Sequence, residues 1–246
     1  QDLILIFPKG EWQVKYRYIF VDLDNTLLDF EAAEEYSFYY TAQSRGLSFG
    51  EAELERYQAI NAPLWKMMER REITKEALVV RRFRELFEEL GITGIDPEQY
   101  NADYLNNLAL CTRTIDGAEE LCRFIHENGV LIIATNGVSA TQHRRIAASG
   151  LEPWLDKVVV SDDAGAEKPD PRYFERAFAV SGAGDKSECI IIGDSLTSDI
   201  KGGQQFGIDT CWFNPKGKAL PEDMPVPTYT VSGLSEFIDI LNGKDL

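Results

Sequence analysis

The sequence has few of the residues that build zinc sites and disulfides. Its 246 residues include four cysteines and two histidines, and no two cysteines stand in the C-x-x-C spacing typical of zinc ligands. We expect Cys189 and Cys211 to be buried in or beside strands as small apolar side chains, in a reducing compartment. The sequence therefore predicts a cytoplasmic protein without a zinc site.

Long apolar runs and positive charge are also scarce. The apolar residues 3–7 are too few to span a membrane and lack the basic flank and cleavage site of a signal peptide. The chain has 25 lysines and arginines against 41 acidic residues, a net charge of −16. A surface this negative repels phosphate backbones. We therefore expect neither a membrane nor a nucleic acid polymer as a partner, whereas a small phosphate ester is compatible with a site that carries its own cations.

Residues 31–110 have the composition of helices throughout. Within them, residues 51–71 form a helical pattern that we expect Pro63 to break or kink. Thr74 and Asp96 are typical residues for the N-caps of two further helices. Four or five helices without an intervening strand predict a separate helical bundle.

After Arg113 the pattern changes to alternating strands and helices. Two spacings resemble capping boxes at helix starts, Asp116 with Glu119 and Ser139 with Gln142. Together with the apolar residues 19–21, the expected strands are 130–134, 158–160, 189–192, 209–213 and 229–231. This alternation predicts an α/β fold with a doubly wound parallel sheet.

Polar residues gather where the predicted strands end, and the carboxyl ends of parallel strands meet at one edge of a sheet. Neighbouring carboxylates repel one another, and a hard cation such as Mg²⁺ relieves that repulsion. A lysine and a hydroxyl can bind phosphate oxygens, and a carboxylate can attack phosphorus. The residues at these strand ends or in the loops that follow are Asp22, Asp24, Thr135, Asn136, Lys168 and Asp194.

Four motifs in chain order resemble those of the haloacid dehalogenase (HAD) superfamily. They are Asp22-x-Asp24-x-Thr26, Thr135, Lys168-Pro169 and Gly193-Asp194-x-x-x-x-Asp199. The resemblance covers the chain from about residue 17 to its end. Each motif alone is short, but their order and their positions at strand ends agree.

The resemblance implies a role for each matching residue. Asp22 would be the nucleophile, and Asp24 would protonate the leaving oxygen and then activate water. Mg²⁺ would be held by Asp22, by the backbone carbonyl of Asp24 and by Asp194, with Asp199 as a more distant or water-mediated ligand. Thr135, Lys168 and the backbone N–H of Asn136 would hold the phosphoryl group. The second aspartate, Asp24, is absent from true haloacid dehalogenases, so its presence favours phosphoryl transfer.

The spacing of the motifs resembles that of HAD enzymes with a helical cap of the C1 type. Asp24 and Thr135 are 111 residues apart (135 − 24), which leaves room for a helical insert, whereas Thr135 and Lys168 are 33 apart (168 − 135). The expected division is an extension of unknown role at residues 1–15, a core at residues 16–30 and 111–246, and a cap at residues 31–110. Such a cap closes over the site and shapes specificity.

Shorter stretches resemble the YjjG family of pyrimidine 5′-nucleotidases. They are Asn61-x-Pro63-Leu64-Trp65, Thr135-Asn136-Gly137, Thr210-Cys211-Trp212 and Thr230-Val231-Ser232. The resemblance implies that Asn61, Trp65, Arg82 and Phe83 could face a nucleoside. The helical spacing of Trp65 and Phe83 equally fits packing in the core of the bundle.

The preferred function is therefore a Mg²⁺-dependent phosphomonoesterase that forms an aspartyl-phosphate and acts on pyrimidine nucleoside monophosphates, as a monomer or homodimer. A sugar phosphate, phosphoglycolate or N-acylneuraminate 9-phosphate as substrate, or a phosphomutase, would need the same core with another cap. Gly193-Asp194-Ser195-Leu196 matches the motif of GDSL esterases, but no histidine base follows His143. A receiver domain would be about half this length, and a non-catalytic HAD module would be expected to lack Asp22 or Lys168.

Overall fold

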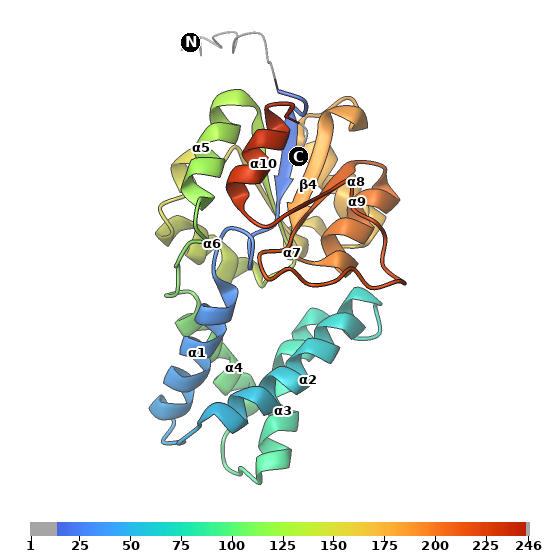
Figure 1. Cartoon of the computed structure of the whole chain (residues 1–246). Helices are drawn as coiled ribbons and strands as arrows, with labels where there is room; N and C mark the ends of the chain where they lie inside the picture. The colour runs from blue at the N-terminus through green and yellow to red at the C-terminus, as the bar shows by residue number, and fades with distance from the viewer. Residues whose placement is uncertain (1–13, 245–246) are drawn as a thin grey trace, which may run out of the picture.

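A computed structural model describes residues 14–244 and shows a six-stranded, wholly parallel sheet in the order β3-β2-β1-β4-β5-β6 (Figure 1). Strand β1 lies in the interior of this order, flanked by β2 and β4. The predicted α/β class with a parallel sheet is confirmed. The strands are β1 Tyr18–Val21, β2 Val130–Thr135, β3 Lys157–Val160, β4 Cys189–Gly193, β5 Asp209–Phe213 and β6 Tyr229–Val231.

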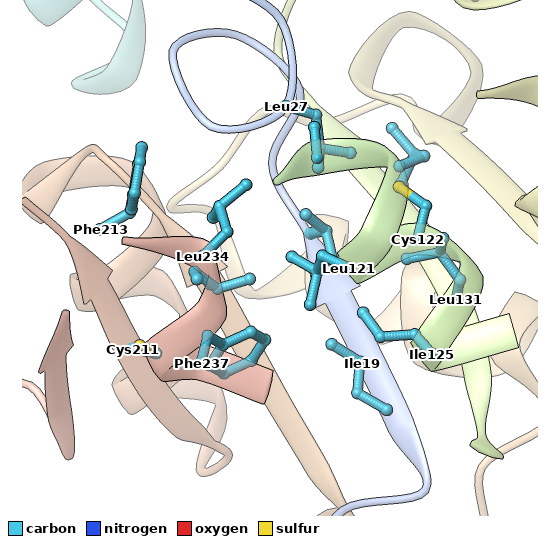
Figure 2. Packing of buried hydrophobic residues seen from close by; sticks show 14 of the residues in the cluster. Ile19, Leu27, Leu121, Cys122, Ile125, Leu131, Cys211, Phe213, Leu234 and Phe237 are labelled. Atoms are coloured by element: carbon cyan, nitrogen blue, oxygen red, sulfur yellow. The ribbon is translucent and has the colours of Figure 1, made fainter. Parts of the chain in front are cut away.

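Strand β1 is apolar on both faces because both faces are covered by helices. Its residues Ile19 and Val21 pack in one cluster with Leu121 of α5 and Phe237 of α10, as Figure 2 shows for the labelled residues. Tyr18 and Phe20 point to the opposite face, where they pack in a second cluster formed with α8 and α9. The core helices are α5 Ala118–Asn128, α6 Ser139–Ala148, α7 Ser161–Ala164, α8 Pro171–Ser181, α9 Lys201–Phe206 and α10 Leu234–Leu241.

Short irregular turns complete the core. Glu152–Trp154 and Lys186–Glu188 form 3₁₀ turns, and Leu196–Ile200 forms a π-helical turn directly after β4. Cys189 and Cys211 are fully buried in β4 and β5, as expected, and the described residues contain no disulfide.

Four helices lie together beyond the carboxyl end of the sheet (Figure 1). Their shared apolar cluster is separate from the two clusters of the core, and Tyr57, Phe83 and Tyr104 are fully buried in it. We refer to these helices as the cap bundle. They are α1 Phe30–Ser44, α2 Glu51–Glu69, α3 Lys75–Leu90 and α4 Pro97–Leu108. The exact domain limits stay a prediction, and residues 1–13 lie outside the described residues.

Pro63 does not break α2, which runs without interruption from Glu51 to Glu69. Of the expected break or kink, the break does not occur. Pro63 lies on the exposed face of α2, while Ile60, Leu64 and Met68 bury the opposite face in the cap bundle. Packing of that apolar face offsets the hydrogen bond that a proline removes.

The two expected capping boxes are also wrong. Helix α5 follows Gly117, and α6 follows Val138, in both cases without a side-chain cap. Gln142 instead points its amide at the strand ends. The N-cap of α5 is one residue after the expected Asp116, and the N-cap of α6 is one residue before the expected Ser139.

Two crossing segments join the cap bundle to the core, and they run side by side. Leu28 and Thr114 form an antiparallel bridge, and the N–H of Ile115 donates to the carbonyl of Leu27 at 2.8 Å. Arg113 forms an ion pair with Asp29 across the same crossing. In residues 14–244, no helix is both long and apolar enough to cross a membrane.

Candidate active site

Asp22 stands at the point where β1 ends, beside the ends of two neighbouring strands. Val21 is in register with Ile133 of β2 and Ile192 of β4, so the residues that follow the three strands meet at one edge. Asn25 adopts a left-handed conformation (φ 58°) in the turn after β1, and its side-chain oxygen accepts from the N–H groups of Phe30 and Glu31. This turn sends the chain into α1 while Asp22 and Asp24 stay at the sheet edge.

Three carboxylates converge at this edge, those of Asp22, Asp194 and Asp199. One ligand oxygen from each lies within 4.8 Å of the others. Burial, and then the neighbouring carboxylates, raise the pKa of Asp22 well above its ordinary value, although Lys168 opposes the shift. Burial, with repulsion from Asp199, raises the pKa of Asp194 to about 7. The geometry therefore concentrates negative charge that a cation would stabilise.

Lys168 is almost fully buried and holds two of these carboxylates. Its Nζ donates to Asp22 at 2.7 Å, to Asp199 at 2.6 Å and to the carbonyl of Ala134 at 2.6 Å. Burial disfavours the charge on Lys168, but Asp199 and Asp22 raise its pKa above the ordinary value, so the lysine stays charged. A fixed ammonium group beside a carboxylate is suited to hold an anionic substrate group.

Gly193 is required by the position of Asp199. A Cβ added at Gly193 would lie 2.2 Å from a carboxylate oxygen of Asp199. The same oxygen of Asp199, Oδ2, accepts from the backbone N–H of Ser195 at 3.1 Å, while Lys168 donates to the other oxygen. The glycine of the fourth motif thus permits the close approach of the acid that pairs with Lys168.

Thr135 and Asn136 follow β2 and face the same edge. The Thr135 hydroxyl oxygen accepts from Gln142 at 2.8 Å and from the N–H of Gly137 at 3.2 Å. The Asn136 side chain forms two 2.8 Å bonds with the backbone of Lys168, donating to its carbonyl and accepting from its N–H. Asn136 therefore ties the loop after β2 to the segment that carries the lysine, a function of its side chain that the sequence had not indicated.

The Asp24 carboxylate is bound by two side chains of α6. Gln142 donates to one of its oxygens at 2.7 Å, and Arg145 forms an ion pair with the other. Both α6 side chains are buried. Sequence reasoning missed both, although their three-residue spacing, which puts them on one face of a helix, was visible.

A single cavity of about 710 Å³ connects this edge of the sheet with the cap bundle. This volume is in the range of small-molecule sites. Of the four cap residues expected to face a nucleoside, Asn61, Trp65 and Arg82 line the cavity. Phe83 does not line it, and its ring stacks on Tyr57 inside the bundle at a centroid distance of 5.3 Å.

The cap side of the cavity is polar at its buried centre. Glu34, which is buried, accepts from Asn61 at 3.2 Å and from Gln58 at 3.1 Å. The Asn61 oxygen accepts from the Trp65 ring N–H at 3.1 Å and from Arg82 at 3.4 Å. Burial raises the pKa of Glu34. This arrangement offers amide, carboxyl and aromatic groups to a ligand in the cavity.

The oxygen ligands at the sheet edge fit Mg²⁺. Asp22, Asp194 and Asp199 supply carboxylate oxygens, the ligands that this ion prefers, and no cysteine or histidine belongs to the cluster. Asp24 takes no part through its side chain, which Arg145 and Gln142 engage.

The sequence profile of haloacid dehalogenase-like hydrolases matches residues 16–207. The chain belongs to this family. The HAD match covers the sheet edge described above together with the whole cap bundle, so the resemblance first seen in four short motifs extends over most of the chain.

Several relatives align with nearly the whole length of this chain. The HAD-hydrolase YfnB of Bacillus subtilis is 37% identical over 93% of this chain and 96% of its own length. The pyrimidine 5′-nucleotidases PynA of Streptococcus pneumoniae and YjjG of Escherichia coli are 36% and 33% identical, over 92% and 93% of this chain and 95% and 99% of their own lengths. A crystal structure of YfnB with bound magnesium superposes with a TM-score of 0.87 over 93% of this chain and 99% of its own. The chain is therefore a HAD hydrolase similar to phosphoric monoester hydrolases.

Proposed function

We propose that this protein is a Mg²⁺-dependent 5′-nucleotidase that hydrolyses pyrimidine nucleoside monophosphates through an aspartyl-phosphate on Asp22. The observation that carries the proposal is the setting of Asp22, a buried carboxylate 2.7 Å from the Lys168 ammonium at the floor of a large cavity. The names of PynA and YjjG, two relatives aligned over almost their full lengths, support a pyrimidine nucleotide as the substrate.

Phosphoryl transfer would proceed in two steps. A carboxylate oxygen of Asp22 attacks phosphorus and the ester bond to the nucleoside oxygen breaks. Asp24, which has to take up a proton before this step, gives that proton to the leaving oxygen. A water molecule then attacks phosphorus and gives a proton to Asp24, and the Asp22 carboxylate leaves. Phosphate is released with both aspartates restored to their starting states.

The cation and the fixed hydrogen-bond donors would each stabilise part of the negative charge of the phosphoryl group. Mg²⁺ held by Asp22, Asp194 and the backbone carbonyl of Asp24, with Asp199 nearby, would reduce the repulsion between the nucleophile and the phosphate. Lys168, Thr135 and the N–H of Asn136 would bind the remaining oxygens. These groups are held by the protein before substrate arrives, so little reorganisation accompanies the reaction.

The cap side of the cavity would receive the nucleoside. Asn61 and Gln58 present amide groups, and Trp65 presents an indole ring beside them. Amide hydrogen bonds and an aromatic face suit a pyrimidine base. Arg82 donates to Asn61 and Asn101 and would hold Asn61 in place, whereas Phe83 would support the bundle from behind.

The test is phosphate release from a panel of esters with Mg²⁺ or with EDTA. The panel holds dUMP, dTMP, UMP, AMP, a hexose phosphate, phosphoglycolate and N-acetylneuraminate 9-phosphate. We expect Mg²⁺-dependent turnover with a preference for the pyrimidine monophosphates and no turnover by Asp22→Asn. The exposed Asp223→Asn is the control for loss of one charge and should keep full activity. A preference for a sugar or glycolate phosphate would refute the nucleotidase, and metal-independent turnover would refute the carboxylate site.

A further inference from the structure

Arg145 occupies an unusual position for an arginine. It lies on α6, its side chain is fully buried, and it does not line the cavity. Arginine is seldom buried to this degree unless its charge is paired. Its partner is Asp24, which donates and accepts the protons in the proposed reaction.

The two oxygens of the Asp24 carboxylate are held separately. Arg145 Nη1 pairs with Oδ1, and Gln142 Nε2 donates to Oδ2 at 2.7 Å. Arg145 Nη1 also donates to Gln142 Oε1 at 3.1 Å, which joins the two α6 side chains to each other. A carboxylate held at both oxygens has its plane and direction fixed.

The same guanidinium group contacts both crossings between the core and the cap bundle. Arg145 Nε donates at 3.3 Å to the carbonyl of Cys111, shortly after α4 ends. Its central carbon lies 5.7 Å from the ring centroid of Phe30, the first residue of α1. Both contacts lie where the chain passes between the core and the cap bundle, so a cap movement that shifts these crossings would change them.

One nitrogen of the Arg145 guanidinium group does not donate a hydrogen bond to any described residue. Nη2 is buried and has no hydrogen-bond partner among the described residues. A buried donor without a partner costs free energy, so a position of the crossings that supplied an acceptor would be favoured. The observed arrangement is therefore one in which Arg145 still has an interaction to gain.

We propose that Arg145 is a positioning residue that couples the placement of the cap to the direction of the Asp24 carboxylate. When the cap moves over the cavity, the shift of Cys111 and Phe30 carries the guanidinium group, and with it Asp24, relative to the leaving oxygen. Gln142 acts as the second support. The proposal rests on the proposed phosphatase function, and it adds residues outside the four motifs to the machinery that controls proton transfer.

Leaving-group dependence separates positioning from simple structural support. A nucleoside oxygen leaves poorly and needs the proton from Asp24, whereas p-nitrophenolate leaves without one. The phosphoenzyme, which is the same from either substrate, still needs Asp24 to activate water. Misplacing Asp24 should therefore slow the first step for the nucleotide, spare it for the aryl ester, and slow the second step for both.

The experiment compares Arg145→Lys with the wild type on dUMP and p-nitrophenyl phosphate by stopped flow. We expect the rate of the first turnover of dUMP to fall about 10- to 100-fold, which is part of the usual contribution of general acid–base catalysis. The first turnover of the aryl ester should change by less than about threefold. It should appear as a burst of nitrophenol, with a larger amplitude than in the wild type, because the phosphoenzyme accumulates. Equal losses on both substrates without a burst would overturn the proposal.

Three further variants complete the test. If Arg145→Lys does not fold, Gln142→Met, which removes one bond to Asp24, takes its place. A wild-type ratio of the first-turnover rates on dUMP and p-nitrophenyl phosphate would then overturn the proposal. The cap link is tested by Phe30→Leu, with Arg113→Ala as control, since Arg113 joins the same crossings without contacting Arg145 or Asp24. We expect a changed rate ratio only for Phe30→Leu, and equal ratios would refute the link. An inactive wild type would instead refute the proposed function itself.

Discussion

Replacing Asp194 by asparagine should stabilise the metal-free protein while it removes the function. Burial and the neighbouring Asp199 raise the pKa of Asp194 from 3.8 to about 7. A shift of this size, at about 1.4 kcal/mol for each pKa unit, corresponds to a cost of ~4 kcal/mol when the ionised form is buried. Asp194 keeps part of its surface exposed at the cavity, where solvent screens the charge, so we expect a gain of ~2 kcal/mol.

The sign of the pH dependence follows from linkage. Between pH 3.8 and about 7 the folded state binds more protons at Asp194 than the unfolded state does, so the wild type loses stability as the pH rises through this range. Asparagine does not titrate, and the advantage of Asp194→Asn should therefore grow with pH. From the two pKa values, about half of the final gain should appear between pH 5.5 and pH 8.

The assay is thermal and urea unfolding in EDTA at pH 5.5 and pH 8, with Asp223→Asn as the control for net charge. For a chain of this size, ~2 kcal/mol corresponds to a rise in Tm of roughly 4–8 °C at pH 8. Millimolar Mg²⁺ should raise the Tm of the wild type and leave that of Asp194→Asn almost unchanged. A destabilised variant, or a gain that does not depend on pH, would show that the ionised Asp194 does not destabilise the folded, metal-free protein.

Further substitutions test other parts of the site. Lys168→Ala should lower kcat/KM by at least about 100-fold because one charged donor to the phosphoryl group is lost, and an unchanged value would place Lys168 outside the reaction. Gly193→Ala should displace Asp199, and steady-state assays should show raised Mg²⁺ requirement; an unaltered requirement would contradict the crowding at this position. Trp65→Ala should raise KM for dUMP more than for p-nitrophenyl phosphate, which has no base, and equal changes would exclude base contact.

The fold class could be predicted from the sequence, and so could the convergence of the motif residues at one edge of the sheet. Parallel strands end at one edge, so Asp22, Thr135 and Asp194 could be placed together once the strands were recognised. The structure brings these residues to one cavity with Lys168. The packing of alternate residues of β1 against opposite layers of helices follows from the same apolar run that marked the strand.

The surroundings of Asp24 could not be predicted in the same way. Gln142 and Arg145 occur in a helix with ordinary polar composition, and a helix start at Ser139 offered a local explanation for Gln142. Their contact with Asp24 depends on how α6 packs against α4 and α7, which is a matter of tertiary packing rather than of local pattern.

The cap residues show a second limit of sequence reasoning. Phe83 and Arg82 are adjacent in α3, yet Arg82 lines the cavity and Phe83 packs among Tyr57 and Tyr100. Both have almost no exposed surface. A helical period identifies a buried face but cannot say whether that face meets a cavity or the centre of a bundle.

In the proposed reaction, Asp22 carries the phosphoryl group during turnover. The most direct measurement is acid quenching of the enzyme during reaction with ³²P-labelled dUMP and Mg²⁺, followed by peptide mapping. We expect label on a peptide that contains Asp22, its loss on treatment with hydroxylamine, and its absence in Asp22→Asn. Turnover of dUMP by wild-type enzyme without any labelled protein under single-turnover conditions, or label that persists in Asp22→Asn, would contradict it.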